Sequence, residues 1–217
     1  MFDYSKARDH MVESQIRTSD VTDLPLLTAF RRIPRELFVP QAKSALAYGD
    51  THIEMDEGRV MLRPRDFAKM VQAAEIEPTD VVLDLACARG YSTAILAQIS
   101  DTVVGLETSE DAVNRATELL VDAAVDNAAV VQGSLKSGAS EHGPYNVIFV
   151  NGAIHKPLKS WFDQLTNGGR LIAVVQDGPV GRATLFHKSG DVIGERVIFD
   201  SAAPYLPGFA PEPAFSF

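Results

Sequence analysis

Two acidic side chains, Asp84 and Glu107, accompany short apolar runs that have the character of buried strands. Asp84 lies near the end of the run 81–85, and Glu107 directly follows the run 102–106. A turn of small residues, 86–90, comes after the first run. A carboxylate at the carboxyl end of a parallel strand can accept hydrogen bonds from both ribose hydroxyls of a nucleoside, and a turn without bulky side chains lets the backbone come close. The pattern predicts a nucleoside-type cofactor site at these strand ends.

Other side chains that could act as nucleophiles or metal ligands form no comparable pattern. Cys87, the single cysteine, lies in the small-residue turn without a base that can be named for it, so we interpret it as a packing residue. No histidine stands at metal-ligand spacing from another or from Cys87, which argues against a zinc site. The histidines are His10, His52, His142, His155 and His187.

Strand and helix patterns alternate from residue 80 onward, and these elements must position the two carboxylates. Apolar runs predict strands at 81–85, 102–106, 128–132, 145–150 and 170–175. Helical patterns lie between them at 91–98, 110–124 and 158–165, and Asn167-Gly168-Gly169 is expected to end the last one. This order predicts a doubly wound, Rossmann-like α/β fold with a mostly parallel sheet. The runs 183–187 and 192–199 predict an antiparallel hairpin at the C-terminal end of the sheet.

The segments on either side of this core predict a single domain, 1–217, in three parts. Residues 1–78 form an N-terminal helical extension on the substrate side, with Asp3 or Ser5 as the N-cap of the first helix and Thr22 as that of the second. A long irregular region reaches about residue 63, and such loops are often functional. Residues 79–200 form the α/β core, and 201–217 form an extended tail whose aromatic side chains should pack on the surface.

Composition places the chain among soluble globular proteins. Hydrophobic residues make up 46% and charged residues 23%, and the formal net charge is −9. That charge argues against binding nucleic acid, because phosphate neutralisation needs clustered Lys and Arg. No apolar run approaches the roughly 20 residues of a membrane span, and no signal peptide is apparent. A single cysteine favours a reducing compartment, so we expect a cytoplasmic protein; the sequence leaves the oligomeric state open.

Several motifs resemble those of the protein-L-isoaspartate O-methyltransferase family. The block 84–90 is similar to the acidic, glycine-rich motif of S-adenosylmethionine (AdoMet)-dependent methyltransferases. The segments 11–17, Pro34-Arg35-Glu36-Leu37-Phe38-Val39-Pro40 and 47–50 resemble the N-terminal signature of the family. Val150-Asn151-Gly152-Ala153, Pro157, Gln164-Leu165 and 168–171 continue the resemblance in order, so that it covers roughly residues 7 to 176.

This resemblance implies a protein-repair enzyme that transfers the methyl group of AdoMet to the free carboxylate of isoaspartyl residues in damaged proteins or peptides. The implied cofactor-binding residues are Asp84, Ala86, Ala88, Gly90, Glu107, Gly133 and Ser134. The implied substrate-binding residues are Arg63, Pro64, Asn151, Gly152 and Ala153. Tyr48 and Asp50 border the implied substrate cleft, and His155 is a further contact candidate.

Three departures from the family pattern lie on the ligand-facing side of the predicted site. Val60 and Leu62 replace a threonine and a serine, so the catalytic residues stay unknown. Ala86 and Ala88 stand in place of glycines, and the Cβ of Ala88 is the more serious obstruction. Gly133-Ser134 lacks the aspartate that is expected to hold the adenine amino group, although a serine hydroxyl can still accept one hydrogen bond.

These departures leave two main hypotheses: an active but divergent enzyme, and a catalytically silent relative that serves as a ligand-binding or regulatory module. An NAD-dependent oxidoreductase is a third alternative, but only Gly90 remains of a Gly-x-Gly-x-x-Gly turn. Four arginines near the loop could bind an anion other than AdoMet or could be exposed loop charges: Arg59, Arg63, Arg65 and Arg89.

Overall fold

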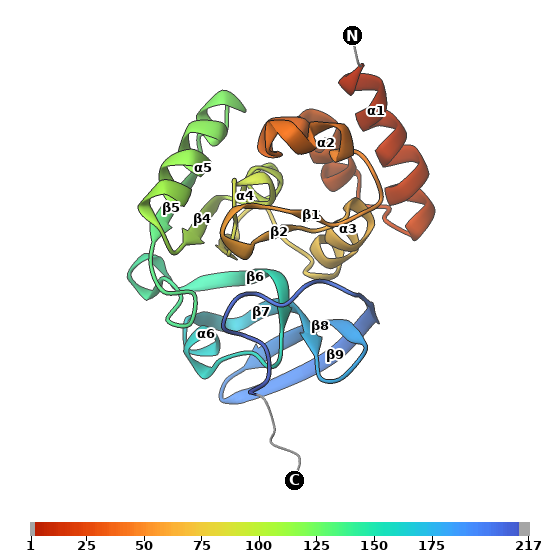
Figure 1. Ribbon diagram of the computed structural model, residues 1–217. Helices are drawn as coiled ribbons and strands as arrows, with labels where there is room; N and C mark the ends of the chain where they lie inside the picture. The colour runs from red at the N-terminus through yellow and green to blue at the C-terminus, as the bar shows by residue number, and fades with distance from the viewer. Residues whose placement is uncertain (1–2, 213–217) are drawn as a thin grey trace.

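The computed structural model describes residues 3–212, and Figure 1 shows a twisted central sheet with helices on both faces. The predicted tail residues 213–217 and the first two residues lie outside the described part. The sheet order is β5-β4-β3-β6-β7-β8-β9. Strands β5 to β7 are parallel, and β8 and β9 are antiparallel, which confirms the predicted doubly wound fold and its closing hairpin. The strands of the sheet are β3 (Val81–Leu85), β4 (Thr102–Glu107), β5 (Ala128–Gln132), β6 (Tyr145–Ile154), β7 (Leu165–Gln176), β8 (Gly181–Ser189) and β9 (Val192–Asp200).

Alternating side chains along the strands build one apolar layer on each face of the sheet. On one face, Val82 and Val147 pack under the N-terminal helices, α3, α4 and α5. On the other face, Leu83 and Ile148 pack under α6 and the C-terminal tail. The helices are α1 (Tyr4–Met11), α2 (Leu24–Arg32), α3 (Pro64–Ala73), α4 (Tyr91–Leu96), α5 (Glu110–Asp122) and α6 (Lys159–Asp163).

The N-terminal extension is helical as predicted, with two differences in detail. Asp3 caps α1 by accepting a hydrogen bond from the Lys6 backbone N–H, at 3.1 Å. The chain then tightens into a π-helical turn, Val12–Ile16, and a 3-10 turn, Arg17–Ser19. Helix α2 is capped by Asp23 and not by the predicted Thr22, because the Asp23 carboxylate accepts from the Leu26 N–H at 2.8 Å.

The region predicted to be irregular up to residue 63 contains ordered elements. Two 3-10 helices, Arg35–Phe38 and Gln41–Leu46, precede a short antiparallel hairpin. The hairpin consists of β1 (Ile53–Glu54) and β2 (Val60–Met61), joined through the 3-10 turn Asp56–Gly58. We call residues 53–61 the strap, because they cross in front of α4 in Figure 1 and contact the ends of the sheet strands.

The second half of the core corrects two predicted boundaries. Helix α6 ends at Asp163, and Asn167-Gly168-Gly169 lies inside β7, where the register against β6 shifts and Gly168 has φ +82°. Strand β6 extends past the predicted residue 150, because Ala153 and Ile154 still pair with β7. The tail also bonds to this end of β6: Ala153 N–H donates to the Pro204 carbonyl, and Leu206 N–H donates to the Ala153 carbonyl, both at 2.8 Å.

The described part of the tail packs on the molecule as expected. Phe209 is 7% exposed, and its ring lies 5.5 Å from that of the buried Trp161. Within residues 3–212, no helix has the length and apolar character needed to cross a membrane.

Candidate functional site

The sheet reverses its winding between β3 and β6, and the predicted site residues gather at the carboxyl ends of β3, β4 and β6. Ligands of doubly wound folds bind at this switch point. Asp84 comes from β3, Glu107 ends β4, and Asn151 lies on β6. The structure therefore brings together three of the residues that the sequence singled out, although they are far apart along the chain.

Asp84 is fully buried among neutral hydrogen-bond donors. One carboxylate oxygen accepts from Ser92 Oγ at 2.7 Å and Thr93 Oγ1 at 2.6 Å, and the other accepts from Asn151 Nδ2 at 2.6 Å. Burial raises the pKa of the Asp84 carboxyl to about 6, because these neutral donors only partly offset the loss of water. The network ties β3, α4 and β6 together. Ser92 and Thr93 were not among the predicted site residues, although hydroxyl side chains in the first turn of the helix after the loop were a usable signal.

The loop after β3 has the backbone of a glycine-rich turn but carries alanines. Ala86, Ala88 and Gly90 have φ values of 59°, 54° and 88°. This left-handed region is open to glycine and costs other residues about 1–2 kcal/mol. Cys87 is buried, and burial raises the pKa of its thiol well above the ordinary value, so it has the character of the predicted packing residue.

Glu107 is also buried, but it faces a cation supplied by the strap. Arg59 Nε donates to both carboxylate oxygens at 3.0 Å, and Arg59 Nη2 donates to Oε2 at 2.8 Å. Ala88 N–H donates to Oε1 at 2.7 Å, and Thr108 N–H donates to Oε2 at 3.1 Å. The side chains of Arg59 and Glu107 are only 5% and 1% exposed. Every lone-pair direction that a ligand could use on this carboxylate is therefore taken by the chain itself.

A group of partly exposed polar contacts holds the strap next to this buried pair. Asp56 accepts from Arg89 Nε at 3.0 Å and from Arg115 Nη1 at 2.8 Å. Burial raises the pKa of the Asp56 carboxyl, but the two guanidiniums outweigh that effect and hold the pKa below its ordinary value. Glu57 accepts from Ser109 Oγ at 2.7 Å, at the start of α5. These contacts join the strap to the cofactor loop and to α5.

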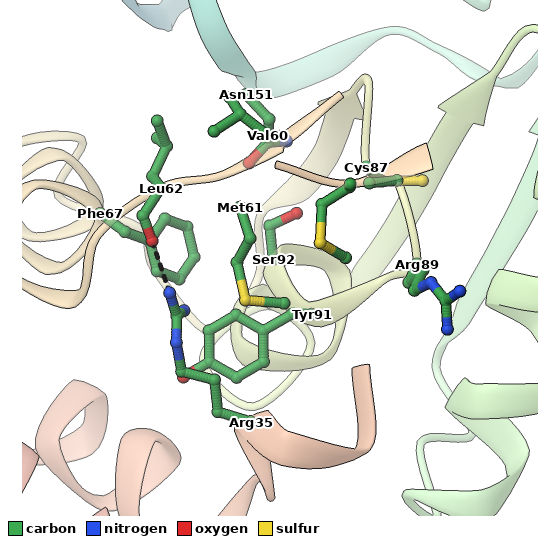
Figure 2. Close-up of a pocket in the computed structure, with 12 residues that line it drawn as sticks. Arg35, Val60, Met61, Leu62, Phe67, Cys87, Arg89, Tyr91, Ser92 and Asn151 are labelled. Carbon is green, nitrogen blue, oxygen red and sulfur yellow. Dashed lines mark hydrogen bonds between the residues drawn. The ribbon is translucent and has the colours of Figure 1, made fainter. Parts of the chain in front are cut away.

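Little open space remains between the strap and the strand ends. Figure 2 shows the larger cavity, where Met61 lies over the ring of Tyr91 and Asn151 and Val60 lie on another wall. This cavity holds about 20 Å³, and a second one beside Arg59 and Glu107 holds about 10 Å³. Such volumes suit about one water molecule. With these side chains in place, the cavities do not accommodate AdoMet, although Asp84 and Glu107 lie at the strand ends where the sequence predicts a nucleoside site.

Arg35 is the buried cation on the other side of the larger cavity. It is 0% exposed, and its guanidinium donates to the carbonyls of Ala47 and Leu62, both at 2.7 Å. The guanidinium carbon of Arg35 also lies 4.7 Å from the centre of the Tyr91 ring. Figure 2 shows Arg35 next to this ring and its hydrogen bond to Leu62. Arg35 thereby joins the 3-10 helix Arg35–Phe38 to Leu62, directly after the strap, and to α4, which gives the Pro34–Pro40 motif a structural role.

The remaining predicted residues surround the site at varying depth. Arg63 pairs with Asp66, with Nε to Oδ1 at 2.9 Å, and Pro64 begins α3. Gly152 and Ala153 are buried under the tail, where a Cβ on Gly152 would meet Leu206 at 2.8 Å.

The last five predicted residues lie around the edge of the site or on the surface. Gly133 N–H donates to the Glu107 carbonyl at 2.8 Å, whereas Ser134 is exposed. Tyr48 donates to Glu36, and burial raises the pKa of its hydroxyl. Asp50 is exposed, and His155 Nδ1 lies 3.9 Å from an oxygen of Asp177.

Comparisons with known proteins agree on one family. The family model described as protein-L-isoaspartate(D-aspartate) O-methyltransferase (PCMT) matches residues 6–202. A protein-L-isoaspartate O-methyltransferase from Methanoculleus marisnigri is 38% identical over 170 residues, which cover 78% of this chain and 77% of that one. A protein-L-isoaspartate O-methyltransferase 2 from Pelobacter propionicus is 34% identical over 171 residues, or 77% of this chain and 75% of that one.

Solved structures give the same fold at lower identity. A protein-L-isoaspartate O-methyltransferase structure superposes with a TM-score of 0.80 and 23% identity, over 93% of this chain and 66% of that one. A beta-aspartate methyltransferase (PCMT) from Plasmodium falciparum, in complex with S-adenosyl-L-homocysteine (AdoHcy), superposes with a TM-score of 0.77 and 17% identity, over 95% of this chain and 99% of that one.

Proposed function

Because the chain belongs to the protein-L-isoaspartate O-methyltransferase family, we propose that it transfers a methyl group from AdoMet to the free carboxylate of isoaspartyl residues in damaged proteins. One observation carries the proposal: Asp84, Gly90 and Glu107 stand at the carboxyl ends of adjacent parallel strands, where a nucleoside site of this fold belongs. The proposed substrate is an isoaspartyl protein or peptide in the cytoplasm.

The proposed methyl transfer needs little acid–base catalysis. A carboxylate is ionised at pH 7, so the attacking group needs no general base. A sulfonium donor, when bound, would supply an electrophilic methyl group and leave as a neutral thioether, so the transfer would cancel the charge on both partners. Alignment and exclusion of water are then the main demands on the protein. The apolar strap residues Val60 and Met61, with the adjacent Leu62, supply a dry wall but no polar side chain, so no side chain is assigned a catalytic proton transfer.

The proposal requires a second conformation of the strap. Arg59 and Met61 fill the space beside Glu107 and the loop, so the donor enters only after the strap moves away from the strand ends. No step of the reaction is assigned to the closed arrangement.

The direct test is a methyl-transfer assay with radiolabelled AdoMet and a synthetic isoaspartyl peptide, with the matching aspartyl peptide as the control. We expect base-labile methyl ester to form on the isoaspartyl peptide only. Absence of ester at millimolar donor and substrate, from protein that is folded by circular dichroism, would overturn the proposal.

A second candidate function is a catalytically silent relative that keeps the fold as a binding module. The buried Arg59–Glu107 pair favours it, because a permanent occupant of the ribose position would exclude the donor. Turnover in the assay above decides between the two. The oxidoreductase alternative is not favoured, because the family model that matches residues 6–202 describes a methyltransferase family.

A further inference from the structure

The Arg59 guanidinium and a nucleoside ribose would bind the same acceptor in the same way. Arg59 presents neighbouring N–H groups to the Glu107 carboxylate, and Nη2 also donates to Thr108 Oγ1 at 3.0 Å. A ribose 2′,3′-diol presents two neighbouring O–H groups. Both are paired donors that suit one carboxylate, and the planar fork of arginine matches carboxylate geometry best. Glu107 has no capacity left to hold both.

The rest of the Glu107 environment comes from the backbone and is fixed in place. Ala88 N–H and Thr108 N–H hold the carboxylate from the loop and from the end of β4. Arg59 is different, because it is carried on a strap whose strands, Ile53–Glu54 and Val60–Met61, are only two residues long. Its departure would therefore leave an oriented carboxylate with its acceptor directions open toward the smaller cavity, which Arg59 and Ala88 both line.

We propose that Arg59 determines the ligand specificity of this site: it is a built-in occupant of the ribose position that competes with the methyl donor for Glu107. The inference rests on the proposed function only in taking the carboxyl ends of β3 and β4 as the donor site. It places the obstruction at Arg59, whereas the sequence alone pointed to the Cβ of Ala88. Wild-type protein therefore binds adenosyl nucleosides weakly, and loss of the guanidinium is what admits them.

Calorimetric titration with AdoHcy tests this competition, because AdoHcy lacks the sulfonium charge that a nearby arginine would repel. Arg59→Gln should bind AdoHcy at least about 30-fold more tightly than wild type, since the nucleoside no longer has to break a buried ion pair. Arg170→Gln is the matched control: it breaks the Arg170–Asp80 pair at the opposite end of β3 and should leave AdoHcy affinity within about threefold of wild type.

Chemical rescue supplies a second readout. Arg59→Ala leaves room for a free guanidinium ion, so methylguanidine at about 20 mM, far below denaturing concentrations, should weaken AdoHcy binding to this variant and leave Arg59→Lys unaffected. Equal AdoHcy affinities in wild type and Arg59→Gln, or binding by neither, would overturn the proposal. If Arg59→Gln does not fold, Arg59→Lys is titrated instead, because a point charge cannot reproduce the fork.

The outcomes separate this inference from the proposed function. Tight AdoHcy binding by Arg59→Gln without methyl transfer supports the competition and overturns the enzyme. Methyl transfer by wild type with AdoHcy affinity equal to that of Arg59→Gln supports the enzyme and overturns the competition.

Discussion

Asp84 and Glu107 are two buried carboxylates at the ends of neighbouring strands, and they differ in the groups that donate hydrogen bonds to them. Asp84 is held by hydroxyl and amide groups from α4 and β6, which belong to the framework of the sheet. Glu107 is held by backbone N–H groups and by a guanidinium from outside the sheet. Burial raises the pKa of the Asp84 carboxyl although its hydroxyl and amide donors lower it, and their hydrogen bonds join secondary-structure elements. In contrast, the Arg59 guanidinium occupies the Glu107 oxygens that could otherwise accept hydrogen bonds from a ligand.

The difference shows that keeping a motif is not the same as keeping a site. Both carboxylates are present in the sequence, and both lie at the strand ends where the sequence predicts a nucleoside site. The Glu107 carboxylate, however, is occupied by Arg59, a residue 48 positions away in the chain. A motif match therefore indicates where the framework residues lie. Whether the site can bind a ligand depends on which group donates hydrogen bonds to the Glu107 carboxylate.

The largest effect is expected from separating the buried pair. Arg59→Ala leaves the Glu107 carboxylate buried without its cation, so we expect a loss of about 3–5 kcal/mol in the free energy of unfolding. Urea denaturation measures it, and AdoHcy should restore part of the loss by binding the folded state. The double variant Arg59→Met/Glu107→Gln, which removes both charges, should recover most of the stability. A loss below about 1 kcal/mol in the single variant would show that the pair is not a buried ion pair in solution.

Asp84 should make stability depend on pH in a direction set by its raised pKa. Because the folded-state pKa is about 6 and the ordinary value is 3.8, the folded protein keeps a proton between these values that the unfolded chain releases. Stability from this group is present below pH 4 and is lost as pH rises through about 6, by about 3 kcal/mol in total. Asp84→Asn should remove that fall, so the stability of wild type minus that of the variant should decrease from pH 4 to pH 7.5. A difference independent of pH would contradict the raised pKa.

Removing one donor from the Asp84 network should have a smaller effect. Thr93→Val keeps the shape of the side chain but deletes the hydrogen bond to Asp84, which should cost about 1–3 kcal/mol and raise the pKa of Asp84 further. Thermal denaturation at pH 7.5 and pH 4.5 measures both, because the loss should shrink at the lower pH, where Asp84 is protonated. Thr28→Val, on an exposed helix position bonded only to its own helix, is the control.

The smallest effect is expected at the exposed end of the strap. Arg115→Gln removes one of the two guanidiniums on Asp56, whose side chain is 45% exposed, so the loss should be below about 1 kcal/mol and should vanish in 1 M salt. Denaturation at low and high salt measures it. A loss as large as that of Arg59→Ala would mean that the strap is held at its surface and not by the buried pair.

Much of the fold could be predicted because its signals are local. The apolar runs of β3 and β4, the small-residue turn and the acid after the second run are contiguous in sequence, and they assemble as expected. Boundaries were wrong where tertiary contacts override local chemistry. The stretch Asn167–Gly169 has the composition of a helix end, yet it lies inside β7, where the register against β6 shifts. Strand β6 continues past residue 150 because its end pairs with β7 and also bonds to the tail.

The state of the site could not be predicted, because it depends on a pairing that no local pattern encodes. Arg59 stood out only as one of four arginines near the loop, and exposed charge was the simpler interpretation. The structure places it in the interior on Glu107 instead, whereas Arg89 remains at the surface on Asp56. The β1–β2 hairpin that carries Arg59 has strands too short to show a period of two, so the region was predicted as a loop.

The competition for Glu107 is tested most directly by following the Arg59 side chain itself while a nucleoside is added. The Arg59 Nε–H gives a separate ¹H–¹⁵N signal, which can be assigned by its absence in Arg59→Gln. During titration of wild type with AdoHcy, we predict that this signal leaves its ion-paired position in step with the fraction of protein that holds the nucleoside. Bound AdoHcy beside an unmoved Arg59 signal would contradict the claim that guanidinium and ribose share one acceptor.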